Sequence, residues 1–252
     1  MAPEQFGDYF EPMIGGGALF LSLQPERGVI ADANEDLINF YVCLRDDTQA
    51  LCAALAQLEA SKEEYYRRRA ERPGSPLEQA MRFYYLNRLC WNGLYRVNLK
   101  GQFNVPFGGR VPRTMCDVEN LSEASRILQN VRILHGDFEE TTSAAHEGDF
   151  VYFDPPYPKG AADNDGFCHY NRTRFTYKDH QRLAKAASTL ADCGVHVMIT
   201  ESAHPRILDL YGSRFFKSVV KSRSLIAGRS DRRGEVDEAI ITSYDALVPC
   251  SQ

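Results

Sequence analysis

Short apolar runs recur along the chain, and each is followed by a turn or a helix signal. Apolar runs of about four to eight residues between such signals are typical of buried strands. Five of them alternate with helical segments: Asp8–Glu11, Gly28–Asp32, Val131–His135, Phe150–Phe153 and Val195–Thr200. Two later runs, Phe215–Val220 and Glu238–Ser243, flank a basic, glycine-containing loop and are expected to pair as antiparallel edge strands. This alternation predicts an α/β fold with a mostly parallel sheet covered on both faces.

The helix before the fifth strand is the best marked one in the chain. Thr176 and Asp179 form a capping-box pattern, and Gly194 ends the helical pattern. The positions between them carry an apolar stripe at helical spacing, made of Leu183, Ala187 and Leu190.

The alternation of strands and helices stops between residues 43 and 117. This stretch is polar and helical, with helix-start signals at Ser61/Glu64 and at Ser75-Pro76/Glu78. It ends in Tyr95–Phe107, which is expected to form a β-hairpin that turns at Lys100-Gly101. The pattern predicts a helical insertion with a hairpin, placed on an α/β body formed by residues 1–42 and 118–252.

The composition of the 252-residue chain is that of an ordinary globular protein, with 44% hydrophobic and 25% charged residues. This excludes collagen-like, low-complexity and largely disordered chains. No apolar run approaches the ~20 residues of a bilayer span, and the N-terminus lacks the pattern of a secretory signal. The seven cysteines are scattered without a C-x-x-C pair. We therefore expect a cytoplasmic protein without a disulfide framework, a membrane partner or a metal site.

The formal net charge of −5 is unevenly distributed. Residues 62–113 hold 11 Lys/Arg against 4 Asp/Glu, a balance of +7, which leaves −12 for the rest of the chain. A second basic stretch, residues 214–233, holds 7 Lys/Arg against one Asp. Two basic patches on an acidic body favour a polyanionic partner such as nucleic acid. Solvated helix faces explain the charge pattern equally well.

A glycine-rich segment follows the first strand. It reads Glu11-Pro12, then Gly15-Gly16-Gly17. Glycines at this place let the backbone turn sharply and approach a nucleotide-like ligand closely. The spacing is not G-x-G-x-x-G, so a dinucleotide is not favoured. A tight strand-to-helix turn explains these glycines equally well.

Asp32 ends the second strand, 15 residues after Gly17. A carboxylate at this position commonly accepts hydrogen bonds from ribose hydroxyls. The alternative is that Asp32 caps the helix that starts near Asn34.

The segment Asp154-Pro155-Pro156-Tyr157 follows the apolar run Val151–Phe153. Open α/β sheets bind their ligands at this end of a buried strand. The two prolines fix the backbone, so the Asp154 carboxylate and the Pro155 carbonyl are able to accept both hydrogens of one exocyclic amine. Tyr157 supplies a ring that can stack on a planar base. A purely structural turn is the competing interpretation.

The chain resembles the Dam-type (D12 class) DNA adenine N6-methyltransferases, in which a target-recognition insertion precedes the Asp-Pro-Pro-Tyr motif. The resemblance covers nearly the whole chain and is carried by Phe10–Phe20, Ala31–Tyr41, Tyr85–Gly108, Gly136–Phe138 and Asp154–Tyr157. It implies a Rossmann-like, S-adenosylmethionine-dependent methyltransferase sheet. Residues 1–42 and 118–252 would form the catalytic domain, and residues 43–117 the target-recognition domain with its hairpin.

The resemblance also implies the methyl donor, S-adenosylmethionine, and the residues that bind it. These are Glu11, Pro12, Gly15, Gly17, Asp32, Asp137, Phe138 and Asp154. Asp32 would hold the ribose, and Asp137 and Phe138 would address the adenine of the donor. Asp154, Pro155, Pro156 and Tyr157 would receive the target adenine and carry the catalysis.

Duplex DNA is the implied partner, and GATC the implied target sequence. The segment Trp91–Phe107, which contains the hairpin, would read the sequence. Arg96 would read a guanine, Leu94 and Pro106 would contact thymine methyls, and Asn92 would support the strand left without its partner base. A phosphate contact or a surface ion pair is the alternative for Arg96. The basic residues Lys100, Arg110 and Arg113 would contact phosphates.

One part of the family pattern has no counterpart here. Members carry an aromatic-x-Gly-Gly-Lys segment some twenty or more residues before the first glycine loop, whereas 14 residues precede Gly15. The alternative prediction is therefore a catalytically impaired, DNA-binding relative. In either case we expect a monomer encoded by a bacterium, a phage or a mobile element.

Overall fold

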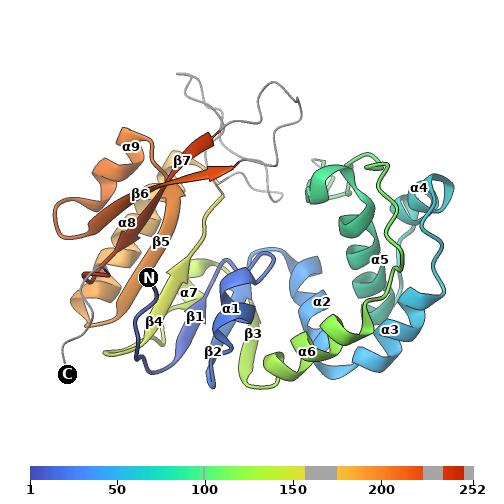
Figure 1. Ribbon diagram of the computed structural model, residues 1–252, viewed down its shortest axis with the longest axis horizontal. Coiled ribbons are helices and arrows are strands. Elements are labelled where there is room, and N and C mark those ends of the chain that lie inside the picture. The colour runs from blue at the N-terminus through green and yellow to red at the C-terminus, as the bar shows by residue number, and fades with distance from the viewer. Residues whose placement is uncertain (99, 157–174, 224–234, 247–252) are drawn as a thin grey trace.

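The computed structural model describes residues 1–98, 100–156, 175–223 and 235–246. The strands are β1 (Tyr9–Glu11), β2 (Gly28–Asp32), β3 (Val131–His135), β4 (Phe150–Phe153), β5 (His196–Ser202), β6 (Phe216–Arg223) and β7 (Glu235–Thr242). Within the described residues they form one sheet in the order β3-β2-β1-β4-β5-β7-β6 (Figure 1). The predicted α/β fold with a mostly parallel sheet is confirmed.

The first five strands are parallel, and the last two reverse the direction of pairing. β1 pairs in parallel with both β2 and β4, and β5 continues the parallel part beside β4. β7 pairs antiparallel with β5 and with β6. The predicted antiparallel pair is therefore confirmed. Of its two strands, β6 lies at an edge of the sheet, whereas β7 lies between β5 and β6.

The described helices fall into two groups. Those of the α/β body are α1 (Ala18–Leu23), α2 (Glu35–Asp46), α6 (Val118–Leu128), α7 (Phe138–Thr141), α8 (Tyr177–Asp192), α9 (Pro205–Leu208) and η2 (Asp209–Tyr211). Those between α2 and α6 are α3 (Thr48–Ala56), α4 (Lys62–Ala70), α5 (Pro76–Leu89) and η1 (Trp91–Gly93). None of the helices in the described part of the chain combines the length and the hydropathy of a membrane span.

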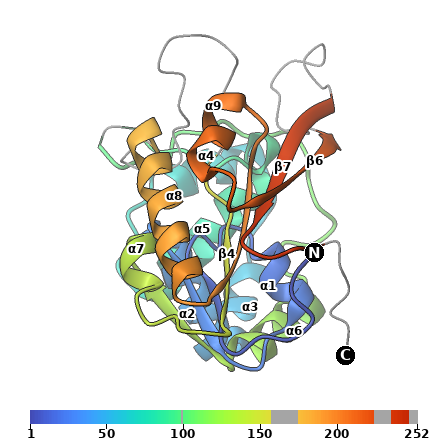
Figure 2. The same cartoon turned by 90° about the vertical axis from the view of Figure 1, so that its left-hand side faces the viewer.

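Alternating residues of the sheet pack into two cores on its opposite faces. In β4, Phe150 and Tyr152 belong to the core under α1, α2 and α6, whereas Val151 and Phe153 belong to the core under α7 and α8. This follows from the period of two in a strand. Figure 2 shows α1 and α8 on opposite sides of β4. The sheet is therefore covered on both faces, as predicted.

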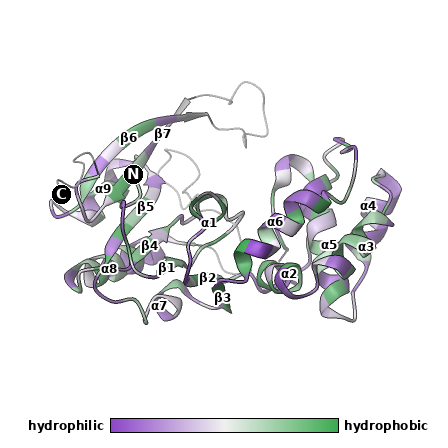
Figure 3. Ribbon diagram, turned by 60° about the horizontal axis from the view of Figure 1, so that its bottom comes forward, coloured by the Kyte–Doolittle hydropathy of each residue, from purple (hydrophilic) through white to green (hydrophobic). Residues whose placement is uncertain are grey.

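The helices of the insertion begin where the sequence signals them. The Ser61 hydroxyl accepts a hydrogen bond from Glu64 N–H at the start of α4 (3.2 Å). Ser75 and Glu78 form a capping box at the start of α5. α4 is mostly hydrophilic (Figure 3), and it contributes Tyr65 to a third, smaller core with α5 and the hairpin.

The hairpin turns close to the expected position, but its described residues form no regular strand. Asn98 N–H donates to the Gln102 carbonyl (2.9 Å), and Gly101 N–H donates to the Asn98 carbonyl (2.8 Å). In the described residues the two arms are joined by isolated bridges at Val97–Phe103 and at Cys90–Phe107.

A row of aromatic rings joins the hairpin to α2. Phe40 of α2 contacts Phe83 of α5, Phe83 contacts Tyr95, and Tyr95 contacts Phe103 of the opposite hairpin arm. The Tyr95 hydroxyl also donates to Asp36 in the first turn of α2 (3.0 Å). The predicted boundary between the catalytic and target-recognition domains, after residue 42, falls inside α2, which continues to Asp46. The division into two domains therefore stays a prediction.

Gly28 has no room for a side chain. A Cβ there would lie 2.1 Å from the carbonyl oxygen of Tyr9, its partner in the β1–β2 register. We expect Gly28→Ala to force β1 from β2 and to lower the free energy of unfolding by about 1–3 kcal/mol in urea denaturation. Gly16→Ala is the matched control, because its Cβ would meet no atom within 4 Å. Equal midpoints for the two variants would contradict this packing argument.

Candidate active site and nucleic-acid interface

The loop after β1 is shaped by its glycines. Gly15 and Gly17 adopt φ values of 47° and 67°, in the left-handed region that favours glycine. A Cβ at Gly17 would lie 2.9 Å from the Tyr41 hydroxyl, which itself donates to the Gly15 carbonyl (2.9 Å). Ile14 N–H donates to the carbonyl of Ala31 in β2 (2.9 Å). The loop is thus a fixed turn that ends beside the end of β2.

Asp32 is buried at the end of β2, with 5% of its surface exposed. Its carboxylate accepts hydrogen bonds from Gly15 N–H (3.2 Å) and from Asn34 N–H (2.9 Å). Burial raises the pKa of the Asp32 carboxyl, and these bonds oppose the rise. Asn34, and not Asp32, is the N-cap of α2. The helix-cap alternative for Asp32 is therefore wrong.

Glu11, at the end of β1, points into the protein. One of its carboxyl oxygens accepts hydrogen bonds from the Tyr9 hydroxyl (2.6 Å) and from Phe20 N–H (3.2 Å). Burial raises the pKa of the Glu11 carboxyl to about 8; the bond from Tyr9 opposes this rise, and the charge of Asp154 adds to it. Pro12 beside it is also buried.

Asp137 caps α7 and binds an arginine that sequence reasoning missed. Its carboxylate accepts hydrogen bonds from Glu139 N–H (3.0 Å) and from Arg182 of α8 (2.8 Å). The Arg182 guanidinium lies 4.9 Å from the ring centre of Phe138. Phe138 is buried in the core and contacts Phe153 edge to face. No local pattern signals Arg182, because it lies 45 residues from Asp137 and only the fold joins them.

Asp154 is exposed directly after β4. The Thr200 hydroxyl of β5 donates to its Oδ1 at 2.7 Å, and the Tyr152 hydroxyl lies 3.0 Å from that of Thr200. Pro155 is buried and Pro156 is half-buried, and neither belongs to a helix. Tyr157 lies outside the described residues. The parallel pairing brings Glu11, Asp32 and Asp154 to one end of the sheet.

The residues expected to contact DNA lie on the hairpin and directly before and after it. Asn92 is exposed and adopts the left-handed conformation (φ 54°). Arg96 is exposed, and its Nε donates to Asn104 Oδ1 across the hairpin (2.7 Å). The remaining members are exposed except for Leu94, which is half-buried: Leu94, Lys100, Pro106, Arg110 and Arg113.

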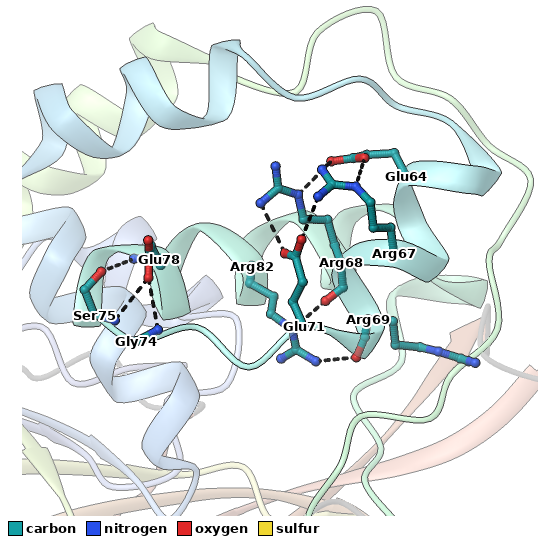
Figure 4. A network of polar contacts seen from close by, with 9 residues as sticks. All are labelled: Glu64, Arg67, Arg68, Arg69, Glu71, Gly74, Ser75, Glu78 and Arg82. Atoms are coloured by element: carbon teal, nitrogen blue, oxygen red, sulfur yellow. Dashed lines mark hydrogen bonds and ion pairs between the residues drawn. The ribbon is translucent and has the colours of Figure 1, made fainter.

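Ion pairs neutralise part of the basic stretch. Arg67 binds Glu64 and Glu71 at 2.5 and 2.7 Å, and Arg68 binds the same two carboxylates at 2.6 and 3.2 Å (Figure 4). Arg82 donates to two carbonyl oxygens at the end of α4, both at 2.8 Å. Between α4 and residue 113, the exposed basic side chains are Arg72, Arg88, Arg96, Lys100, Arg110 and Arg113. Four of these six, Arg96, Lys100, Arg110 and Arg113, lie on or directly after the hairpin.

A cleft of about 730 Å³ opens between α4, α5 and the hairpin. Its lining combines guanidinium groups, amides and rings, including Arg69, Asn98, Asn104 and Tyr66. These are side-chain types that contact phosphates and bases in nucleic-acid complexes. In contrast, the described residues contain no group of three or more His, Cys, Asp or Glu side chains arranged to hold a metal ion.

The raised pKa of Glu11 predicts a pH-dependent stability. Its carboxyl titrates near 8 when folded against about 4.5 ordinarily, so its stabilising contribution is full below pH 4.5 and is lost as the pH rises towards 8. Glu11→Gln keeps one side-chain oxygen, which can accept both the Tyr9 and the Phe20 hydrogen bonds as one Glu11 oxygen does, and it does not ionise. We expect wild type to lose about 3 kcal/mol relative to this variant between pH 5 and pH 8, measured by urea unfolding.

Glu123→Gln provides the control, because Glu123 is an exposed carboxylate paired with Arg126. Its stability difference from wild type should stay flat over the same pH range. A flat difference for Glu11→Gln as well would show that Glu11 ionises as it does in water.

Comparisons with known proteins agree with this arrangement. Residues 1–230 match the family model described as D12 class N6 adenine-specific DNA methyltransferase. The chain is 39% identical to the type II methyltransferase M1.LlaDCHI of Lactococcus lactis subsp. cremoris, over 97% of this chain and 89% of that protein. It is 35% identical to the type II methyltransferase M.MjaIII of Methanocaldococcus jannaschii, over 94% and 88% of the two chains. Identity to the DNA adenine methylase of Escherichia coli strain K12 is 32%, over 91% and 84%. The chain belongs to the D12 class of N6 adenine-specific DNA methyltransferases, enzymes whose methyl donor is S-adenosylmethionine.

Proposed function

We propose that this enzyme methylates the adenine of GATC in duplex DNA, after flipping that base out of the helix, with Asp154 and the Pro155 carbonyl as its acceptors. The observation that carries the proposal is the position of Asp154. It is an exposed carboxylate directly after β4, and β4 pairs with β1, the strand that leads into the glycine loop. Acceptor and donor sites would therefore be neighbours at one end of the sheet.

The residues around the glycine loop fit a positively charged methyl donor. The carboxyl groups of Asp32 and Asp154 gather at this end of the sheet, and the field of their charged forms favours a cation. A Cβ at Gly16 would meet no atom within 4 Å, so the loop leaves space beside it. Asp32 would hold the donor through its ribose. When bound, S-adenosylmethionine supplies an already activated methyl group.

Asp137, Phe138 and the loop residues Pro12, Gly15 and Gly17 would complete the donor site. Asp137 would contact the edge of the donor's adenine ring. The hydrogen bond from Arg182 supports this role, because it fixes the orientation of the Asp137 carboxylate. Phe138 is 4% exposed, so its contribution would be a wall behind the donor. Glu11 would act indirectly, because its buried carboxyl group accepts a hydrogen bond from the backbone N–H of Phe20 in α1, the helix that follows the loop.

Asp154 and Pro155 would act on the target nitrogen. The N6 lone pair of adenine is delocalised into the ring, so the amine must become tetrahedral to react. Hydrogen bonds from N6 to the Asp154 carboxylate and to the Pro155 carbonyl favour that geometry and stabilise the developing positive charge. As the N–C bond forms and the S–C bond breaks, Asp154 receives the proton that N6 gives up. Alignment of this kind contributes about 7–11 kcal/mol.

The target adenine must leave the duplex to reach Asp154. Flipping costs a few kcal/mol of stacking, which Tyr157 would offset by stacking on the extruded ring; Asn92 would support the opened strand. Arg96 would read guanine, since its exposed guanidinium is held by Asn104 on the opposite hairpin arm. Leu94 and Pro106 would contact thymine methyls. Lys100, Arg110 and Arg113 would bind phosphates and set the register.

We further propose that the enzyme acts as a monomer in the cytoplasm of a bacterial or phage-infected cell. GATC is a four-base sequence, and methyl transfer to one strand at a time needs a single active site. The basic residues around one hairpin supply a surface for one duplex.

Asp154→Ala tests the catalytic role. We expect it to abolish methylation of genomic DNA that lacks N6-methyladenine, because the acceptor of both an N6 hydrogen bond and the released proton is gone. DNA affinity, measured by fluorescence anisotropy, should stay within about twofold, since the phosphate contacts lie on and after the hairpin. Joint loss of methylation and DNA affinity, or retained methylation, would count against the assignment.

Arg96→Ala tests the reading of sequence. Wild type should methylate a duplex with GATC and spare duplexes with one changed base pair. The variant should lose about 1–3 kcal/mol of that discrimination, or roughly 5- to 150-fold in relative kcat/KM. Arg67→Ala is the matched control, because this arginine is already paired with Glu64 and Glu71.

Two other outcomes of this experiment have distinct meanings. A uniform loss on every duplex would identify Arg96 as a phosphate contact. DNA binding without any methyl transfer by wild type would favour the alternative, a DNA-binding relative with impaired catalysis.

A further inference from the structure

A line of hydroxyl groups lies on one face of the sheet and ends at Asp154. Tyr152 and Asp154 are two positions apart at the end of β4, so their side chains leave the chain on the same side. Thr200 of the neighbouring strand β5 lies between their polar atoms. Its Oγ1 is 2.7 Å from Asp154 Oδ1 and 3.0 Å from the Tyr152 hydroxyl.

The direction of these two hydrogen bonds follows from a count of protons. A threonine hydroxyl has a single hydrogen, and the Asp154 carboxylate can only accept. Thr200 therefore donates to Asp154, and Tyr152 must donate to Thr200. Burial raises the pKa of the Tyr152 phenol, which keeps it protonated and able to donate. The two hydrogen bonds therefore run in one direction, from the Tyr152 hydroxyl to Thr200 and from the Thr200 hydroxyl to the Asp154 carboxylate.

Thr200 is placed more rigidly than the residue to which it donates. It lies in the middle of a strand, where its backbone pairs with Ile240 of β7. Asp154 follows the last residue of β4 and is exposed. An exposed carboxylate at a strand end rotates unless a neighbour holds it, and a misplacement of about 1 Å in a catalytic group can cost 100-fold in rate.

We propose that Thr200, supported by Tyr152, is a positioning residue that fixes the Asp154 carboxylate for methyl transfer. The inference rests on the proposed role of Asp154. Thr200 does not touch the target base or the donor in this account. It orients the carboxylate plane through Oδ1, so that Asp154 meets the adenine amine without first having to reorient.

The experiment compares steady-state methylation by wild type, Thr200→Val, Thr200→Ser and Tyr152→Phe. The substrates are labelled S-adenosylmethionine and genomic DNA that lacks N6-methyladenine, a probe that does not depend on the recognition sequence. DNA affinity and the midpoint of thermal unfolding are measured for each variant. Thr189→Val is the matched control, because the Thr189 hydroxyl donates only to a helix carbonyl on the exposed side of α8.

Thr200→Val should lower kcat by about 10- to 100-fold, with KM for DNA and DNA affinity unchanged within twofold. Thr200→Ser should restore kcat to within about threefold of wild type, because it keeps the donor. Tyr152→Phe should lower kcat in the same direction by a smaller factor. Wild-type kcat in Thr200→Val, or a serine variant as slow as the valine variant, would overturn the proposal.

Further outcomes separate a positioning role from a structural one. If Thr200→Val does not fold, folded Tyr152→Phe decides: a lower kcat supports the proposal, and wild-type kcat overturns it. Equal losses in kcat and in DNA affinity would also overturn it, because they indicate a distorted sheet. Asp154→Asn distinguishes a failure of the proposed catalytic role of Asp154 from a failure of the positioning role of Thr200. Wild-type kcat in Asp154→Asn removes the proposed function itself, whereas an inactive Asp154→Asn beside a fully active Thr200→Val removes only the role of Thr200.

Discussion

Parallel pairing of β1 with both β2 and β4 is the constraint on which the site depends. Parallel strands end at the same edge of a sheet, so three loops from distant parts of the chain meet there. Glu11, Asp32 and Asp154 stand at or directly after those three strand ends. The absence of a side chain at Gly28 lets β1 and β2 approach closely enough to pair.

The three carboxyl groups differ in their burial and in the hydrogen-bond donors that they receive. Glu11 is buried and holds its proton up to about pH 8, with a phenol and a backbone amide as donors. Asp32 is also buried, but it receives two backbone N–H groups that favour the charged form. Asp154 stays exposed, and a side-chain hydroxyl holds it. The same type of side chain therefore has three roles: Glu11 holds the backbone after β1, Asp32 is the proposed ribose acceptor, and Asp154 is the proposed proton acceptor.

Local patterns in the sequence predict most of the sheet. Gly28–Asp32, Val131–His135 and Phe150–Phe153 appear in the structure with the bounds that their apolar runs indicate. Capping signals likewise place the starts of α4 and α5, because a cap involves only neighbouring residues. The position of β7 between β5 and β6 could not be predicted, because it depends on tertiary pairing.

Contacts between residues that lie far apart in the sequence could not be predicted for the same reason. Arg182 and Thr200 meet their partners across 45 and 46 residues, and nothing next to them in the chain marks them. Net charge was a partial guide to the interface. The count of arginines in α4 overstates its positive field, because Glu64 and Glu71 neutralise two of them.

The hydrogen bond from Tyr95 to Asp36 ties the hairpin to the first turn of α2, and α2 begins three residues after Asp32, the last residue of β2. The 12-residue helix is about 18 Å long and carries the ring of Phe40 against α5 farther along. The contact between Tyr95 and Asp36 is a physical connection between the end of β2 and the hairpin. If ligand binding at one end alters the affinity at the other, thermodynamic linkage requires the effect to be mutual and of the same factor.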